Sequence, residues 1–226
     1  MIKYIDAHCH VPDKPIQLNV GVVYNATRPS DWLSVAAGVN AESDIYGCVG
    51  VHPWFVSELS DDWDEKLRYI LINNPQLHIG EIGIDKFKPD IDVQLSVFET
   101  QFRMATELKR GVSLHCVGAW DKVLHVLKVY QNKLPRFILS HRHAGSAKDI
   151  AKMAEKYNMY FSYGNHNLND LACLRATPLG RIVAETDSKN PNEIISVVNK
   201  IAEILDVAPE KMADIIYENT IRMLKK

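Results

Sequence analysis

Short apolar runs rich in β-formers alternate along the chain with stretches whose apolar residues recur at intervals of three and four. This alternation limits the fold more than any other feature, and Leu95, Phe98, Phe102 and Ala105 show its helical part clearly. The predicted strands are Tyr4–His8, Val20–Tyr24, Tyr46–Val51, His78–Ile82, Val112–His115, Phe137–His141, Tyr160–Tyr163 and Ile182–Glu185. Strands in β-then-α order predict an α/β protein with a (β/α)8 TIM barrel, although a doubly wound open sheet gives a similar alternation.

The chain is slightly shorter than a typical barrel of this kind. It has 226 residues, against roughly 250 in most such barrels. Between His10 and Asn19 lies only "VPDKPIQL", which contains two prolines and leaves no room for a crossover helix. We therefore expect a single domain over residues 1–226 whose first helix is missing or shortened. The exposed side of the barrel would then serve substrate access or an oligomer contact.

Net charge and cysteine spacing limit the cellular compartment and the classes of binding partner that are expected. The formal net charge is −2, without a basic tail, which argues against a protein that coats long duplexes through many phosphate contacts. An active site that takes one phosphate at a time stays possible. The four cysteines show no C-x-x-C spacing, and no apolar stretch approaches the roughly 20 residues that span a bilayer. These features predict free thiols, a cytoplasmic location and no membrane partner.

Histidines and carboxylates fall at the ends of several predicted strands. Active sites of (β/α)8 barrels are built at the C-terminal rim, so these side chains are expected to converge. They are His8, His10, Glu81, His115, His141 and Asp187. Their nitrogen and oxygen atoms suit Zn²⁺, and the carboxylates also suit Mg²⁺ or Mn²⁺. The set exceeds what one tetrahedral ion needs, whereas two ions that share one carboxylate would use it fully.

Each of these residues also has an ordinary structural explanation. A single histidine at a strand end is usually a hydrogen-bonded structural residue, but the coincidence at successive strand ends favours a site. Glu81 lies in "LHIGEIGID", an apolar and glycine-lined strand where an unpaired charge would be costly. In "SHRHAGS", His141 and His143 are two residues apart and point the same way on a strand. Spacing alone therefore does not decide between them.

Seven segments, in this order, resemble the TatD family of metal-dependent hydrolases and DNases. They are "IDAHCH", "VGVHPW", "IGEIGID", "SLHCVGAWD", "SHRHAGS", "FSYG" and "AETDS". The tail "KMADIIYENTIRMLKK" is similar to the C-terminal helix of that family. The resemblance implies a (β/α)8 barrel with a two-metal site that hydrolyses phosphodiesters, especially at DNA 3′ ends.

The resemblance also implies a ligand set. In the family the strand-six histidine is followed by a glycine four residues later, which selects His141 because Gly145 follows it at that distance. One ion would be held by His8, His10 and Asp187, the other by His115 and His141, with Glu81 bridging the two. Asp187 and Glu81 would then act in catalysis.

Substrate contacts are expected around this set, with one departure from the family. Many relatives carry an arginine in the strand-five motif where this chain has Val117, so Arg142 or Lys86 is expected to contact the phosphate instead. His52 in "GVHPW" resembles a family position near the substrate, although a histidine that caps the following turn is an equal alternative. His143 is expected to pack in its loop or to meet substrate.

Further polar and thiol residues have simpler expectations. Glu185 and Asp6 lie one step deeper than the predicted ligands and are expected to hydrogen-bond ligating histidines. Cys9 and Cys116 have the opposite parity and are expected in the core. Surface or helix positions are expected for His78, His125 and His166.

The leading hypothesis is a two-metal phosphodiesterase or deoxyribonuclease of the 3′-exonuclease type. In it, a hydroxide held between two divalent ions attacks the phosphorus, and Asp187 accepts the water's proton. An amidohydrolase acting on an amide, lactone or nucleobase is a rival, but such enzymes often bridge their metals with a carboxylated lysine, and none precedes Lys86 on that strand. A non-catalytic barrel subunit that is stabilised by metals is the second rival. DNA or a small phosphodiester is the expected partner, with the protein a monomer or weak homo-oligomer.

Overall fold

The computed structural model describes residues 3–13, 15–40 and 43–225. Its strands form one parallel eight-stranded sheet in chain order. They are β1 (Tyr4–Cys9), β2 (Val20–Asn25), β3 (Ile45–Val49), β4 (His78–Asp85), β5 (Val112–Val117), β6 (Ile138–Ser140), β7 (Met159–Tyr163) and β8 (Ile182–Ala184). A doubly wound sheet would reverse its strand order at a switch point, so the sequential order confirms the barrel.

The barrel is nearly closed by hydrogen bonds between its first strand and the segment that follows its last. The amide of Asp187 donates to the carbonyl of His8 at 3.0 Å, and the amide of His10 donates to the carbonyl of Ser188 at the same distance. The two ends of the sheet therefore meet beside residues that carry the predicted site.

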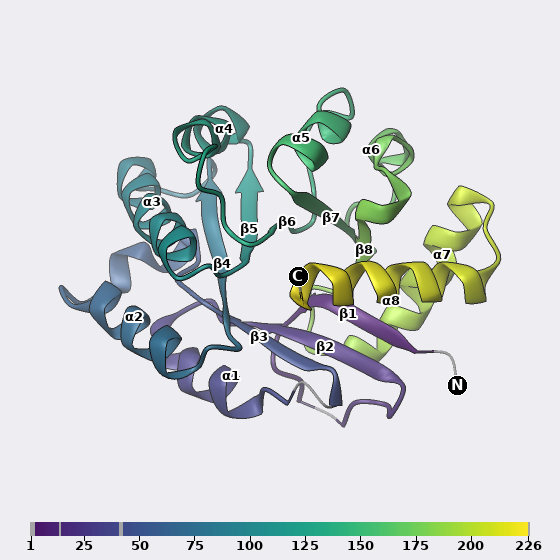
Figure 1. Ribbon diagram of the computed structural model, residues 1–226, viewed down its shortest axis with the longest axis horizontal. Helices are drawn as coiled ribbons and strands as arrows, with labels where there is room; N and C mark the ends of the chain where they lie inside the picture. The colour runs from purple at the N-terminus through teal and green to yellow at the C-terminus, as the bar shows by residue number, and fades with distance from the viewer. Residues whose placement is uncertain (1–2, 14, 41–42, 226) are drawn as a thin grey trace.

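Helices lie around the outside of the strands (Figure 1). They are α1 (Trp32–Gly38), α2 (Trp63–Asn73), α3 (Ile91–Glu107), α4 (Trp120–Val129), α5 (Ile150–Lys156), α6 (Leu171–Ala176), α7 (Ile194–Leu205) and α8 (Pro209–Lys225), with 3₁₀ turns η1 (Pro29–Asp31), η3 (Pro53–Glu58), η4 (Leu179–Arg181) and η5 (Pro191–Glu193). The described residues between β1 and β2 contain no helix, as the two prolines predict. Within the part of the chain that the structure describes, no helix is both long and apolar enough to cross a bilayer.

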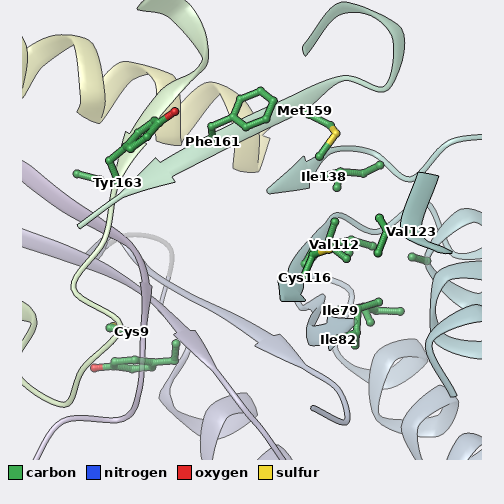
Figure 2. Close-up of a cluster of buried hydrophobic side chains, with 14 of the residues drawn as sticks. Cys9, Ile79, Ile82, Val112, Cys116, Val123, Ile138, Met159, Phe161 and Tyr163 are labelled. Atoms are coloured by element: carbon green, nitrogen blue, oxygen red, sulfur yellow. The ribbon is translucent and has the colours of Figure 1, made fainter. Parts of the chain in front are cut away.

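The main core lies between the sheet and this helical layer. Figure 2 shows Ile79, Val112 and Ile138 of three neighbouring strands beside Val123 of α4. Fully burying such aliphatic side chains contributes roughly 1.5–3 kcal/mol each, which holds the helices to the barrel. Cys9 and Cys116 also belong to this core, as their parity predicts.

A second buried cluster joins the strands to the end of α8. It brings Phe137 and other strand residues together with Met223 and Leu224. His78, the first residue of β4, is buried here, and its ring lies 4.8 Å from that of Phe137. The prediction of a surface or helix position was therefore wrong for His78, because its ring fills space at the foot of the barrel. His125 and His166 are exposed as expected.

Two register shifts in the sheet aim residues of the predicted site. One lies in β1 between Asp6 and Cys9, and the other lies in β4 between Ile79 and Ile82. A bulge of this kind turns a side chain away from simple alternation. Ile79 and Ile82 consequently both join the outer core, although they are three residues apart, and Glu81 lies between them. Glu81 is mid-strand rather than at the strand end as predicted, because β4 continues to Asp85.

Candidate metal centre

The predicted site residues gather around the buried carboxylate of Glu81. Its Oε2 lies 3.3 Å from Nε2 of His8. Its Oε1 lies 2.8 Å from Nδ1 of His115 and 3.2 Å from Nε2 of His141. The two oxygens of one carboxylate thus face different histidines, which come from β1, β5 and the segment after β6.

A second carboxylate completes the cluster on the β1 side. Asp187 Oδ1 lies 3.4 Å from Nε2 of His10 and 3.7 Å from Nε2 of His8. One donor atom from each of these three residues lies within 4.8 Å of the others, close enough to surround one ion. Because His8 faces both Glu81 and Asp187, it connects the two carboxylates.

His52 lies against Glu81 and His115 and also lines the cavity beside the cluster. Its Nε2 is 3.3 Å from Oε1 of Glu81 and 3.2 Å from Nδ1 of His115. Its Nδ1 accepts a hydrogen bond from the amide of Trp54 at the start of η3. Both explanations from the sequence therefore describe part of its environment: the ring caps the turn with one nitrogen and faces the cluster with the other.

Hydrogen bonds fix the orientation of two of these imidazoles. Nδ1 of His8 pairs with the Ser113 hydroxyl at 2.9 Å, and Nδ1 of His10 pairs with the Asn25 carbonyl at 3.0 Å. The Nε2 atom of each ring is thereby turned toward the carboxylates, the arrangement that partners of metal-ligating histidines impose. Sequence reasoning missed Ser113, although it precedes His115 by two residues on β5 and alternation places the two on one face.

Glu185 and Asp6, the two acids expected to support histidines, act differently. Glu185 Oε2 lies 3.1 Å from Nδ1 of His141 and also accepts a hydrogen bond from Ser162. Asp6 accepts from the backbone amide of His8 and from Thr186, so it holds backbone rather than an imidazole.

Burial and neighbouring charges set the protonation of the cluster. Burial alone would raise the pKa of Glu81, but His141, His52 and His8 hold it well below its usual value. Burial likewise opposes ionisation of Asp187, but the hydrogen bond from His10 and the nearby His141 and His8 together outweigh burial and lower that pKa. Burial lowers the pKa of His8 and so favours its neutral form. The cluster thus offers ionised carboxylates and a neutral imidazole.

This donor set suits divalent metal ions. Nε2 of His8 and Nε2 of His115 are buried and have no hydrogen-bond partner within the described residues. A buried nitrogen without a partner is costly in a folded protein, and a cation would satisfy a neutral imidazole lone pair. Imidazole nitrogens with carboxylate oxygens are ligands for Zn²⁺, and the carboxylates also suit Mg²⁺ and Mn²⁺.

A cavity of about 290 Å³ opens onto the cluster. Trp54, Phe55 and Arg142 form part of its wall. The guanidinium of Arg142 donates to Oδ2 of Asp187 at 2.7 Å, so a cation borders the carboxylate from the open side. Lys86 is exposed on the turn after β4 and does not line this cavity.

His143 lies outside the cavity. Its ring is buried against Trp120 and Phe161, and its Nδ1 pairs with the Ser140 hydroxyl at 2.8 Å. Strand β6 ends at Ser140, and Arg142 adopts a positive φ of 41°, so strand alternation no longer relates His141 to His143. Of the two expectations for His143, the structure shows packing, and we do not retain it as a substrate contact.

A family model described as TatD related DNase matches residues 5–225. The chain belongs to this family. It is a TatD-type hydrolase. An uncharacterized metal-dependent hydrolase of Methanocaldococcus jannaschii is 27% identical over 253 residues, covering 100% of this chain and 98% of that protein. The 3′-5′ ssDNA/RNA exonuclease TatD of Klebsiella pneumoniae is 31% identical over 155 residues, covering 65% and 58%. The crystal structure of YjjV, a TatD homologue from Escherichia coli K12, superposes with a TM-score of 0.86 at 23% identity and covers 98% of each chain.

Proposed function

We propose that this TatD protein is a two-metal nuclease that hydrolyses phosphodiester bonds at the 3′ end of nucleic acid. The observation that carries the proposal is the position of Glu81, whose two carboxylate oxygens face two separate groups of histidines. A carboxylate in that position suits a bridge between two cations. The Klebsiella relative is named as an exonuclease on single-stranded DNA and RNA, which supports the choice of substrate.

In the proposed site each ion has its own ligands, and one carboxylate is shared. His8, His10 and Asp187 would hold the first ion and His115 and His141 the second, with Glu81 as the shared carboxylate. His52 is a further candidate for the second ion, because its Nε2 is as close to Glu81 as that of His8. The identity of the ions is open among Zn²⁺, Mg²⁺ and Mn²⁺.

A bound pair of divalent cations supplies a nucleophile at neutral pH and stabilises the entering and leaving oxygens of the displacement. The chain supplies the rest. Asp187 is ionised and would accept a hydrogen bond and then the proton from the attacking water. Arg142 binds the phosphate at the mouth of the cavity. It takes the place of the arginine that many relatives carry where this chain has Val117. Glu185 holds the His141 ring in place.

The rival hydrolase function is less well supported by this cavity. An enzyme that bridges its metals with a carboxylated lysine needs a lysine inside the site. Among the described residues that line the cavity there is no lysine, and Glu81 takes the bridging position.

The four cysteines are free and buried, which suits a single-domain enzyme working in the reducing cytoplasm.

The test measures metal content and turnover on the same preparation. Protein stripped of metal and reloaded with Zn²⁺, Mg²⁺ or Mn²⁺ is offered single-stranded DNA with a free or blocked 3′ end, beside a panel of amides and lactones. We expect metal-dependent shortening of the free 3′ end only, and near-complete loss in Asp187→Ala but not in His125→Ala, an exposed control. Bound metal without turnover on any phosphodiester would contradict the proposal, as would preferred hydrolysis of an amide or lactone.

A further inference from the structure

Two large aromatic side chains are exposed beside the candidate metal centre. Trp54 in η3 is 51% exposed, and Phe87, two residues after the end of β4, is 79% exposed. Trp54 also lines the cavity that opens onto the cluster. Aromatic residues bury a large apolar area when they pack, so a pair left in solvent beside a cavity indicates a binding surface.

One buried carboxylate positions both aromatic residues. Oδ2 of Asp85 accepts the indole N–H of Trp54 at 2.6 Å, and its Oδ1 accepts the backbone amide of Phe87 at 2.9 Å. The same Oδ2 lies 3.6 Å from Nε2 of His115. Asp85 thus ties the turn after β3, the turn after β4 and the proposed metal ligand of β5 into one arrangement. The Trp54 ring and the backbone from which the Phe87 side chain projects are therefore held at a defined place relative to the cluster.

Cationic side chains accompany the aromatic pair. The Lys88 ammonium lies 4.1 Å from the centre of the Trp54 ring, and Lys86 precedes Phe87 on the same turn. Neither lysine forms an ion pair with any residue that the structure describes. Lysines without acidic partners remain available for phosphates, and aromatic faces interleaved with cations are how proteins bind single-stranded nucleic acid without sequence preference.

We propose that Trp54, Phe87, Lys86 and Lys88 form a stacking platform that binds the unpaired nucleobases next to the scissile phosphate. The platform deepens the proposed function and rests on it. Bases present their flat faces to a protein only when they are not stacked in a duplex, so the platform selects single strands over duplexes. It also selects oligonucleotides over small phosphodiesters that carry no base.

Binding of metal-free protein to labelled oligonucleotides tests the platform separately from catalysis. Fluorescence anisotropy in EDTA compares a short single strand, the same strand with abasic sites at its 3′ end, and a blunt duplex. We expect Phe87→Ala to weaken binding of the single strand roughly tenfold, since base–aromatic stacking is lost. Wild type should bind the abasic strand as weakly as Phe87→Ala binds the intact strand. Phe87→Ala should not weaken binding of the abasic strand any further.

Tyr69→Ala is the matched control, because Tyr69 is a comparably exposed aromatic residue (70%) that lies on α2, whereas Phe87 lies on the turn that Asp85 connects to Trp54 and His115. Its binding should equal that of wild type. Phe87→Leu should lose nearly as much affinity as Phe87→Ala, because leucine keeps apolar bulk without a ring face. Unchanged binding in Phe87→Ala, or abasic and intact strands bound equally by wild type, would overturn the platform.

Turnover separates failure of the platform from failure of the proposed function. Metal-loaded protein is assayed on the single strand and on bis(4-nitrophenyl) phosphate, which reports the metal centre without a nucleobase. We expect Phe87→Ala to lower kcat/KM for the strand about tenfold more than for the small diester. If wild type hydrolyses neither substrate, the proposed nuclease function fails, while the anisotropy result still decides whether the platform binds single strands.

Discussion

Histidine is buried at both ends of this barrel, in two different environments. At the foot, Nδ1 of His78 accepts the amide of Gly111 at 3.1 Å, and the charged groups near the ring are those of Arg136 and Arg110. At the rim, only Nδ1 of His8 has a hydrogen-bond partner, and its buried Nε2 faces the carboxylates of Glu81 and Asp187.

The difference separates a histidine that stabilises the fold from one that is available to a ligand. A neutral ring whose Nδ1 lone pair accepts a backbone amide, and whose charged neighbours are arginines, is poorly suited to bind a cation. A buried ring with one nitrogen that lacks a partner lowers the stability of the fold until a further partner, such as a cation, binds that nitrogen. Burial alone does not distinguish the two, because His8 and His78 are both almost inaccessible to solvent.

Glu81→Gln should produce the largest effect and should act on the rim alone. Glutamine keeps the shape of the side chain but removes the charge that faces His8, His115 and His141. Mutating a residue that merely hydrogen-bonds a metal ligand already lowers metal affinity or activity by roughly 10–100-fold. We therefore expect substitution of the bridging Glu81 to lower kcat/KM by more than roughly 100-fold. Metal content by mass spectrometry should fall in parallel, and the thermal unfolding midpoint should fall only by as much as the bound metal had raised it. Retained metal and activity would remove Glu81 from the centre.

His78→Leu should give the opposite result, with loss of stability and retained activity. Leucine fills the space against Phe137 but leaves the buried amide of Gly111 without a partner. An unsatisfied buried donor costs roughly 1–3 kcal/mol, and we expect destabilisation near the upper end of that range in urea unfolding. The exposed His125→Ala should change stability by less than about 0.5 kcal/mol. A loss of nuclease activity in folded His78→Leu would break the separation of the two ends.

The pH dependence of stability should carry the signature of His78. Burial, with Arg136 and Arg110 nearby, lowers its pKa from 6.5 to about 3. Below pH 6.5 the unfolded chain binds a proton that the folded chain does not, so the stabilising contribution is complete above pH 6.5 and declines toward pH 3. Between pH 6.5 and 5 the decline amounts to roughly 1–2 kcal/mol.

Urea unfolding of wild type and His78→Leu across this interval checks the sign. The variant lacks the titrating ring, so its stability should fall less steeply with acid than that of wild type. The gap between the two proteins should therefore narrow as the pH falls. A gap that widens would mean that His78 gains rather than loses its proton on folding.

Much of the fold followed from local pattern, because strands of a parallel barrel are short, apolar and separated by helical stretches. The eight strands lie where these runs predict them, and the prolines between His10 and Asn19 account for the missing helix. His78 was not predictable, since a histidine at a strand start looks like any polar end residue. Only the fold shows that α8 covers this end of the barrel and buries the ring.

At the rim, residue type predicted the members of the cluster better than their geometry. Strand alternation could not place Glu81 or His143, because a register shift in β4 and the positive φ of Arg142 interrupt it. Nor could it show that Asp85 holds Trp54, a contact between residues 31 positions apart. Hydrogen bonds between distant segments depend on where strands stop, and strand ends are the least predictable feature of a sequence.

Ser113→Ala should give the smallest effect and tests whether the rim histidines depend on their partners. The hydroxyl lies 2.9 Å from Nδ1 of His8, and it accepts that N–H when Nε2 faces a cation. Without it the ring loses its fixed orientation, so we expect about tenfold weaker metal binding, equivalent to roughly 1.4 kcal/mol. Metal titration should show this loss, and Ser113→Thr, which keeps the hydroxyl, should recover most of it. Metal affinity equal to that of wild type in Ser113→Ala would mean that packing alone orients His8. The difference between His8 and His78 would then depend only on the buried Nε2 of His8, which has no hydrogen-bond partner within the described residues.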